Sequence, residues 1–340
     1  MADTVNVLTY LRSKTQLDLD SLDLEAARSG GPDGPWTDAT SNPAESYFQL
    51  QKEENKEIVA QAIHLAQDLH ERYSSVTLAE LRVEVATVLL ANQVLPYITG
   101  SVHVMVNPCH AFSTTKVIQT CLRYHEIFHH IDPHFEPSRL VIKVSATFEG
   151  LKACHALRPK GIQTLATTVF TMEQAILAGE AGCVSISPFV HELKAGFDDT
   201  FVLSVLFMAH LLCFLSMVHH AQKYYVQHGI STRVKACSCM SVDEILQLAG
   251  VAAHTMPPED LERLAGMKEA VDSLEKKSLF RSDVSVAVQQ QQIRSYIDDE
   301  AGYRVHFAAS DGGRGQTRLF QAIAIFADFQ HKVEMVMGGQ

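Results

Sequence analysis

Positive charge is scarce in this sequence. Of the 340 residues, 28 are lysine or arginine and 39 are aspartate or glutamate, so the formal net charge is −11. No basic cluster offsets this balance, and we therefore expect no nucleic-acid partner. Charged residues of both signs reach only 20%, whereas apolar residues make up 46%. This composition excludes a disordered chain and can fill a sizeable core.

Long apolar runs and targeting signals are also sparse. Residues 201–218 form the one long uncharged stretch, at the lower edge of the length that spans a membrane. Its serines and histidine favour a buried or subunit-contact helix, so we expect no membrane association and consider a homodimer. The first ten residues lack the basic and apolar regions of a signal peptide. With seven cysteines, an odd number, we expect reduced thiols and a cytoplasmic location.

The chain repeats one supersecondary pattern, in which an apolar strand, a Ser or Thr cap, an amphipathic helix and a glycine follow one another. Such alternation predicts parallel strands with helical crossovers. Capping-box sequences begin three of the helices, at Thr77, Thr171 and Ser241. The predicted strands are residues 16–20, 36–41, 102–107, 140–146, 163–170, 183–189, 233–239 and 251–256.

Eight strands in about 300 residues favour a single (β/α)₈ barrel domain over residues 1–340. An open doubly wound sheet is the alternative, but no G-x-G-x-x-G follows an early strand. In a barrel, chemistry lies at the C-terminal ends of the strands. Lys143 interrupts the apolar strand 140–146 on the same face as Ser145. A buried lysine in its neutral form is an amine nucleophile for carbonyl compounds, and the alternative is a lysine paired with a core carboxylate.

Four segments in register resemble the transaldolase family: 36–43 (WTDATSNP), 140–150 (LVIKVSATFEG), 161–175 (GIQTLATTVFTMEQA) and 178–190 (AGEAGCVSISPFV). The resemblance extends over nearly the whole chain. It implies a (β/α)₈ barrel that uses neither metal nor organic cofactor. It also implies a lysine that forms a Schiff base with a ketose phosphate, cleaves a carbon–carbon bond and transfers a dihydroxyacetone unit to an aldehyde.

The family's site residues correspond to several positions here. The resemblance implies that the Schiff-base lysine is Lys143 and that the acid/base aspartate is Asp20, with Asp18 and Asp23 as alternative registers. It implies that the substrate-binding residues are Asn42, Thr167 and Ser187.

The departures from the family pattern are chemical. The glutamate expected on the third strand is Met105, which cannot carry a proton, and the asparagine expected on the fifth strand is Leu165. The two arginines that hold the substrate phosphate are replaced by Glu192 and Met240. A carboxylate in place of an arginine repels phosphate, so we expect an apolar, anion-repelling pocket and an uncharged carbonyl substrate.

Loss of the third-strand glutamate leaves the proton donor open. His103 shares a strand face with Met105, and His110 lies just beyond the strand end; both are of the residue type that titrates near neutral pH. His191 and Glu192 at the pocket mouth are further candidates. Packed or exposed histidines remain the simpler interpretation, because the chain contains seventeen of them.

Two other motifs are weaker. His125 and His129 form H-E-x-x-H on a predicted helix at 114–130, but no third ligand is evident, and we expect a solvent-facing stripe and no metal. Cys237 and Cys239 lie two apart on a predicted strand, so both thiols should face one way, in ordinary barrel packing.

Three functional hypotheses follow. The first is a transaldolase-like enzyme that uses Lys143 on a non-phosphorylated carbonyl compound in specialised metabolism, in carbon–carbon bond formation, cleavage or isomerisation. The second is a pentose-phosphate transaldolase with displaced phosphate ligands. The third is a catalytically silent barrel with a binding or assembly role.

Overall fold

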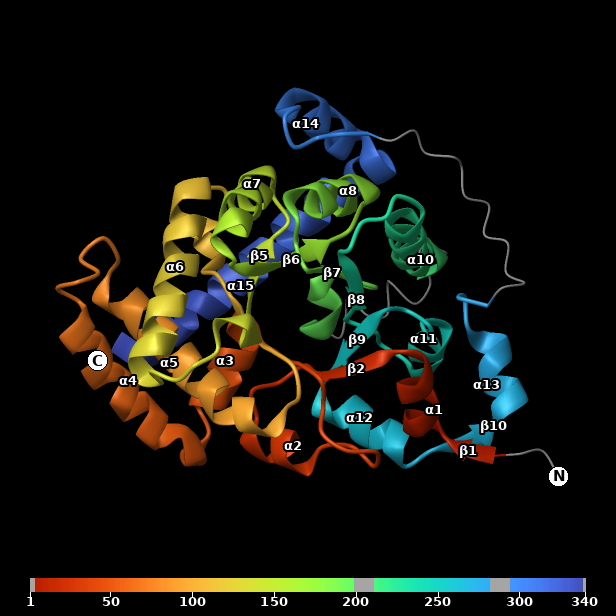
Figure 1. The fold of residues 1–340 in the computed structure, drawn as a ribbon, viewed down its shortest axis with the longest axis horizontal. Coiled ribbons are helices and arrows are strands. Elements are labelled where there is room, and N and C mark those ends of the chain that lie inside the picture. Colours follow the sequence, from red (N-terminus) through yellow and green to blue (C-terminus); the bar gives the residue numbers. More distant parts are fainter. Residues whose placement is uncertain (1–3, 199–210, 282–293, 339–340) are drawn as a thin grey trace.

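Eight parallel strands close into a barrel in the order β2-β3-β4-β5-β6-β7-β8-β9, which confirms the predicted architecture (Figure 1). All eight predicted strands are present, most of them shorter than expected. Their bounds are β2 Gln16–Leu19, β3 Ala39–Thr40, β4 Val102–Met105, β5 Leu140–Ser145, β6 Gln163–Val169, β7 Ser185–Pro188, β8 Arg233–Ala236 and β9 Ala253–Met256.

The structure, a computed structural model, describes residues 4–198, 211–281 and 294–338. Most of the apolar segment 201–218 lies outside the described residues. Its last residues belong to a helix in which Leu215 and Val218 are buried. Among the described residues, no helix is both long enough and apolar enough to cross a membrane.

Helices connect the strands and surround them, as Figure 1 shows. Those within the barrel connections are α2 Leu24–Ser29, α3 Pro43–Leu50, α4 Lys56–Leu69, α5 Leu78–Val94, α6 Thr114–Ile131, α7 Phe148–Leu157, α8 Met172–Ala181, α10 Leu211–Gln227 and α11 Val242–Gln247. Short 3₁₀ helices are η1 Glu53–Asn55, η2 Leu95–Tyr97, η3 Pro108–His110, η4 Pro137–Arg139, η5 Arg158–Lys160, η6 Leu193–Gly196 and η7 Ser310–Gly313.

Elements outside the barrel repeat lie at both ends of the chain. They are β1 Thr4–Asn6, α1 Val7–Lys14, α12 Pro258–Ala265, β10 Lys268–Ala270, α13 Val271–Lys277, α14 Glu300–Ala309 and α15 Arg314–Gly338. β1 and β10 pair antiparallel in a separate two-stranded sheet. α15 packs against α3, α5, η3 and η6. Because η3 follows β4 and η6 follows β7, α15 lies beside the C-terminal ends of these strands.

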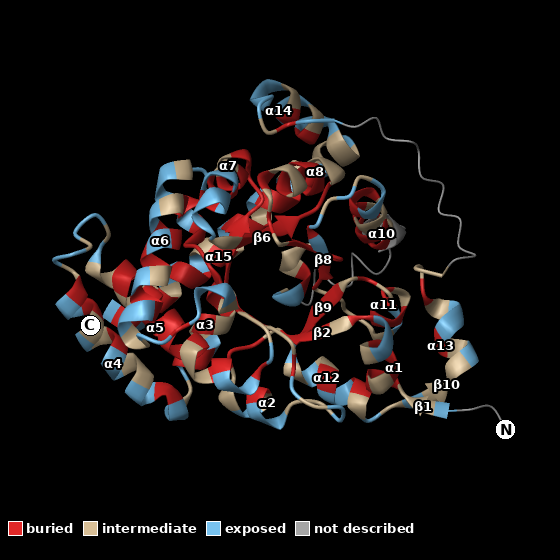
Figure 2. Ribbon diagram, viewed as in Figure 1, coloured by how far each residue is buried: buried red, intermediate tan, exposed pale blue. Residues whose placement is uncertain are grey.

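The strands are buried on both faces, so they appear red in Figure 2. On β5, Ile142 and Val144 point outward into the apolar core beneath the helices, and Lys143 and Ser145 alternate with them on the lumen side. This arrangement explains why β5 is almost entirely apolar, since only the lumen-facing positions admit polar residues.

The predicted caps are largely confirmed. Thr77 caps α5, and Thr171 forms a complete capping box with Gln174 at the start of α8. The capping box predicted at Ser241 is only half formed. The Ser241 hydroxyl accepts the Glu244 N–H, but the Glu244 carboxylate accepts hydrogen bonds from Met240 and His191 instead of Ser241. The Glu244 carboxylate thus binds groups outside the capping box and leaves the second hydrogen bond of the box unformed.

Gln174 also holds a strained part of the barrel. Its amide donates to the Ala146 and Thr168 carbonyls while its oxygen accepts two backbone N–H groups. Thr168 has φ +57°, which is rare for a β-branched residue, at an irregularity in the β6–β7 pairing. Gln174 therefore fixes the backbone next to Thr167.

We expect Gln174→Ala to lower the free energy of unfolding by about 2–4 kcal/mol, because four buried backbone groups lose their partner. Denaturant unfolding followed by far-UV circular dichroism measures this. Gln61→Ala, at an exposed position in α4, is the matched control and should change stability by less than about 0.5 kcal/mol. Equal effects of the two substitutions would contradict the assigned role of Gln174.

Candidate active site

Lys143 lies in the barrel lumen with apolar neighbours. It is 6% exposed, and the strand register places Met105 of β4 and Leu165 of β6 directly beside it. Side chains paired in this way share a face of the sheet. Within the described residues, no hydrogen bond or ion pair reaches the Lys143 amine. Lys143 is therefore buried between apolar side chains, as we expected from the sequence. Its catalytic role stays a prediction.

A second interior lysine, which the sequence analysis did not single out, has the opposite surroundings. Lys235 of β8 is 3% exposed and forms ion pairs with Asp18 and with Asp38, whose Oδ2 is 2.7 Å away. Burial alone would lower the pKa of Lys235, but the two carboxylates outweigh it and raise the pKa. Lys235 is therefore held as an ammonium. The same strand alternation that identified Lys143 could have revealed it.

His103 belongs to this buried network. Its Nε2 lies 3.3 Å from Asp38 Oδ2, and its Nδ1 is buried without a partner among the described residues. Burial, together with the charge of Lys235, lowers the pKa of His103 to about 4. The expectation that His103 titrates near neutral pH is therefore wrong. Because Asp38 precedes β3 while Lys235 and His103 come from opposite sides of the ring, the network spans the lumen.

The three aspartates that the sequence offered as alternatives have different environments. Asp18 is fully buried against Lys235, and Asp23 caps α2 and binds Lys52. Asp20 directly follows β2 at the C-terminal end of the strand and accepts a hydrogen bond from Thr40. Position in the barrel thus favours Asp20 as the acid/base residue.

Asp20 and Lys143 both affect the pKa of Cys237 through their charges. Burial, reinforced by Asp20 and opposed by Lys143, raises the pKa of Cys237 to about 12. These residues come from β2, β5 and the end of β8, so their common influence on Cys237 places them around the same part of the lumen.

The predicted substrate-binding residues are distributed around this lumen. Thr167 and Ser187 are buried on β6 and β7, and the Thr167 hydroxyl has no partner among the described residues. Asn42 caps α3 through Oδ1, which accepts the N–H groups of Ala44 and Glu45. Its carboxamide oxygen is therefore occupied, and any contact with substrate falls to its NH₂ group.

Glu192 is not the free carboxylate that we expected at the mouth. Arg318 of α15 donates from Nε to Glu192 Oε1 at 3.2 Å and from Nη1 to Asp311 at 2.5 Å, and Gln321 donates to Glu192 Oε2 at 3.1 Å. No local pattern predicts this pair, because Arg318 follows Glu192 by 126 residues. Met240 brings no charge, as predicted.

His191 and His110 each lie close to a glutamate. His191 Nε2 is 3.0 Å from Glu244, and His110 Nε2 is 3.2 Å from Glu80. Burial lowers the pKa of His110 more than Glu80 raises it. His110 thus faces α5 and not a free part of the lumen.

A cleft of about 640 Å³ opens beside Asp20. Its lining contains one lysine, Lys52, which binds Asp23, and the aromatic ring of Phe48. The remaining charged groups of the lining are carboxylates: Asp20, Asp23, Glu25, Glu45, Glu259 and Glu262. This surface favours neutral over anionic ligands.

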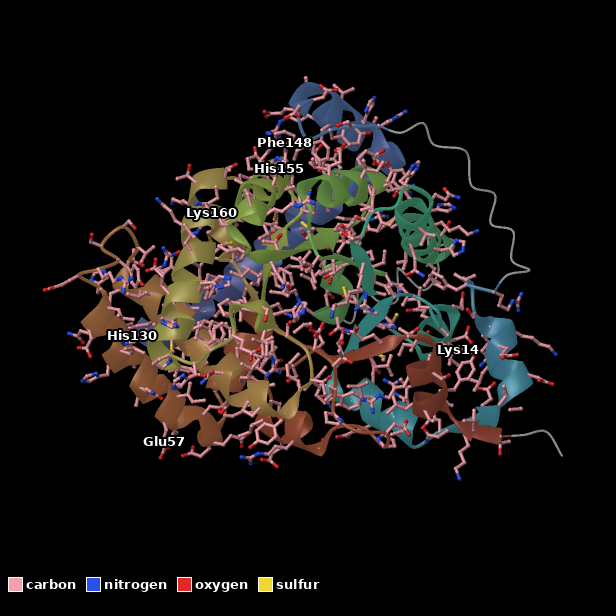
Figure 3. All side chains as sticks on the ribbon, viewed as in Figure 1. Lys14, Glu57, His130, Phe148, His155 and Lys160 are labelled. Atoms are coloured by element: carbon pink, nitrogen blue, oxygen red, sulfur yellow. The ribbon has the colours of Figure 1, made fainter. Side chains whose placement is uncertain are left out.

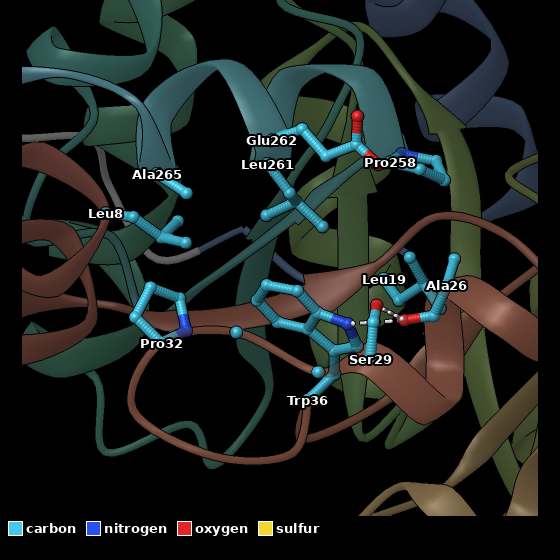
Figure 4. A pocket seen from close by; sticks show the side chains of 12 residues that line it. Leu8, Leu19, Ala26, Ser29, Pro32, Trp36, Pro258, Leu261, Glu262 and Ala265 are labelled. Atoms are coloured by element: carbon cyan, nitrogen blue, oxygen red, sulfur yellow. Dashed lines mark hydrogen bonds between the residues drawn. The ribbon is translucent and has the colours of Figure 1, made fainter.

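The expected solvent-facing stripe at H-E-x-x-H is only partly confirmed: His129 is exposed, but His125 Nε2 is buried without a partner among the described residues. The Glu126 carboxylate of H-E-x-x-H binds Arg72 and Tyr73. Figure 3 shows His130, at the end of the same helix, on the outer helical layer. Within the described residues, no three ligand-type side chains gather in a metal-binding arrangement. A pocket of about 80 Å³ beside Trp36 is mostly apolar and lies between α1, α2 and α12, outside the lumen (Figure 4).

The prediction that Cys237 and Cys239 face one way is wrong. β8 ends at Ala236, and Ser238 has φ +63°, which turns the chain between the two cysteines. Cys237 contacts the Pro188 carbonyl of β7, whereas Cys239 lies 3.6 Å from His254 of β9.

Eight parallel strands that close into a barrel, with helices in the connections between them, define a (β/α)₈ barrel. The sequence profile of the Transaldolase/Fructose-6-phosphate aldolase family matches residues 17–304. The chain therefore belongs to this family of enzymes. It is 30% identical to the transaldolase of Fusarium oxysporum f. sp. lycopersici over 305 residues, which cover 85% of this chain and 86% of that protein. It is 26% identical to the transaldolases of Prochlorococcus marinus (strain MIT 9312), with 87% of each chain covered, and Protochlamydia amoebophila, with 98% and 97% covered.

The environment of His103 makes stability depend on pH. Its pKa of about 4 lies below its ordinary 6.5, so the unfolded chain binds this proton first as the pH falls. This contribution to the free energy of unfolding is complete above about pH 6.5 and is lost toward pH 4, by about 2–3 kcal/mol. Denaturant titrations between pH 7 and 4 should show a smaller loss for His103→Gln than for the wild type. The control is His129→Gln, an exposed position, and parallel curves for wild type and His103→Gln would contradict this account.

Proposed function

We propose that this protein is a Schiff-base enzyme in which Lys143 attacks a non-phosphorylated carbonyl compound. The observation that supports this most is the contrast between the two interior lysines. Lys235 is an ammonium that forms ion pairs with two carboxylates. Lys143 has no partner among the described residues and lies between Met105 and Leu165. A lysine that no carboxylate holds is the one free to attack a carbonyl carbon, whereas ion pairing occupies the Lys235 amine.

The reaction would follow ordinary amine–carbonyl chemistry. The Lys143 Nζ lone pair adds to the carbonyl carbon to form a carbinolamine, and loss of water leaves a protonated Schiff base. That cation accepts the electron pair of the carbon–carbon bond as it breaks, or returns the pair as a new bond forms. Asp20 would remove the proton from the hydroxyl group of the substrate as the bond breaks. The enamine that holds this electron pair then attacks an aldehyde or takes back the proton from Asp20, which regenerates the Schiff base. Addition of water to the Schiff base releases the ketone and restores the lysine.

The charges around the mouth support an uncharged substrate. The cleft beside Asp20 is lined by carboxylates, and its one lysine is bound to Asp23. At the positions of the family's phosphate ligands stand Met240 and Glu192, and the nearby Arg318 already binds Glu192 and Asp311. A phosphate would have to displace these carboxylates. A substrate outside the central sugar-phosphate pathways fits this arrangement, and a specialised metabolite is the class we favour.

One observation favours the second hypothesis, that of a transaldolase acting on sugar phosphates. Arg318 brings a cation to Glu192, from an element that the family motifs do not include. If the Glu192 and Asp311 carboxylates moved aside, Arg318 would become the displaced phosphate ligand. The names of the relatives are consistent with such an activity.

Turnover assays separate these hypotheses. With dihydroxyacetone as donor and D-glyceraldehyde as acceptor, we expect carbon–carbon bond formation, detected by mass spectrometry of the products. Lys143→Met should reduce the rate by about three orders of magnitude or more, since Lys235, the other lysine buried in the lumen among the described residues, is ion-paired. Lys56→Met, an exposed lysine of α4, should leave the rate unchanged.

The phosphorylated pair provides the contrasting result. We expect fructose 6-phosphate with erythrose 4-phosphate to be a poorer combination than the unphosphorylated one. Faster turnover of the phosphorylated pair would replace our proposal with the transaldolase hypothesis. A Lys143→Met protein that retains full activity in either assay would contradict both.

A further inference from the structure

The His191–Glu244 pair connects the chain segments that follow β7 and β8. The segment after β7 continues its pairing beyond the strand, since Val190 N–H donates to the Cys237 carbonyl. His191 is the next residue, at the bend where the chain leaves β7, and its side chain is buried. The Glu244 carboxylate binds His191 Nε2 at 3.0 Å and the Met240 N–H at 2.8 Å. The pair therefore lies beside Glu192 and Met240, where the family pattern has phosphate-binding arginines.

Glu244 determines which nitrogen of His191 carries the proton. Burial opposes ionisation of Glu244, but the hydrogen bonds from His191 and Met240 outweigh it and lower the pKa of Glu244. A carboxylate only accepts hydrogen bonds, so His191 Nε2 must donate. In the neutral imidazole, Nδ1 then carries a lone pair. That atom is buried and has no partner among the described residues.

The other buried histidine–glutamate pair shows what a satisfied arrangement looks like. His110 Nε2 faces Glu80 at 3.2 Å, and its Nδ1 lies 3.5 Å from the Thr120 hydroxyl. Both of its nitrogens have partners. A buried polar atom without a partner costs about 1–3 kcal/mol, so such an atom calls for an explanation, of which a functional role is one.

The unpartnered groups follow adjacent strands. β5, β6 and β7 are neighbours in the barrel, and they carry Lys143, Thr167 and, just past the strand, His191. Lys143 pairs in register with Leu165, so Thr167 lies one lumen-facing position nearer the mouth, and His191 lies beyond it. A molecule attached to Lys143 that extends toward the C-terminal ends of β6 and β7 would pass Thr167 first, and the segment that carries His191 begins just beyond β7.

We propose that His191 binds the end of the substrate remote from the Schiff base and that this end carries a hydroxyl group. The Nδ1 lone pair accepts a hydrogen bond from a hydroxyl, whereas a phosphate dianion offers only acceptors and meets Glu192 and Glu244 nearby. His191 is thus a specificity-determining residue that selects an unphosphorylated hydroxy ketone. This inference rests on the proposed Schiff-base function and adds the chemical class of the substrate.

The test uses borohydride reduction of the full-length protein with three probes: dihydroxyacetone, D-fructose and fructose 6-phosphate. Intact mass spectrometry gives the probe concentration that half-saturates adduct formation. In the wild type, D-fructose should saturate at a lower concentration than fructose 6-phosphate. His191→Phe should raise the half-saturating concentration of D-fructose about tenfold, the loss of one hydrogen bond to a buried group. It should leave the shorter dihydroxyacetone unchanged, and His110→Phe is the matched control that should leave all three unchanged.

Glu244→Gln tests whether the proton position on His191, and not only its packing, determines the preference between the probes. The carboxamide can donate to Nε2, which shifts the proton of His191 to Nδ1 and turns that atom into a donor. The preference for D-fructose over fructose 6-phosphate should then fall. Equal weakening of all three probes by His191→Phe, or no effect on D-fructose, would overturn the inference, as would a wild type that reacts with dihydroxyacetone but not with D-fructose. A wild type that forms no adduct with any probe would instead contradict the proposed function.

Discussion

An ammonium group inside a barrel has to be paired or to give up its charge, because its burial without compensation costs several kcal/mol. Two lysines in the same lumen meet this constraint differently. Lys235 is held between Asp18 and Asp38, and this network extends to His103. Lys143 lies between Met105 and Leu165, and no carboxylate pairs with it within the described residues. The proposed chemistry depends on this difference.

At the mouth of the barrel, too, ion pairing determines which charged groups can bind a ligand. Positive charge there is already matched by carboxylates, as in the contact of Arg318 with Glu192 and Asp311. The same applies to Lys52 and Asp23 in the cleft next to Asp20. A ligand that arrives with a phosphate must compete with these internal anions, whereas a hydroxylated ketone need not. Family membership is therefore compatible with the specificity that we propose, because the proposed nucleophile and the positions of the family's phosphate ligands are separate residues.

Much of the fold could be predicted because its signals are local. Strand–helix alternation and capping residues such as Thr171 lie within short windows, and all eight strands were found. Lys143 was also found locally, from the alternation of β5. The parts that were missed depend on distant partners. Lys235 pairs with a residue 217 positions away, and Glu192 meets Arg318 only because α15 packs beside the mouth. Periodicity also failed where the backbone leaves the strand, at Ser238 between the two cysteines.

The most direct measurement of the central claim is to identify which interior lysine is modified. Protein reduced with borohydride in the presence of dihydroxyacetone is digested, and its peptides are sequenced by tandem mass spectrometry. The account predicts the added mass on Lys143 and an unmodified Lys235. Modification of Lys235 in preference to Lys143 would show that ion pairing does not distinguish the two amines and would contradict the account.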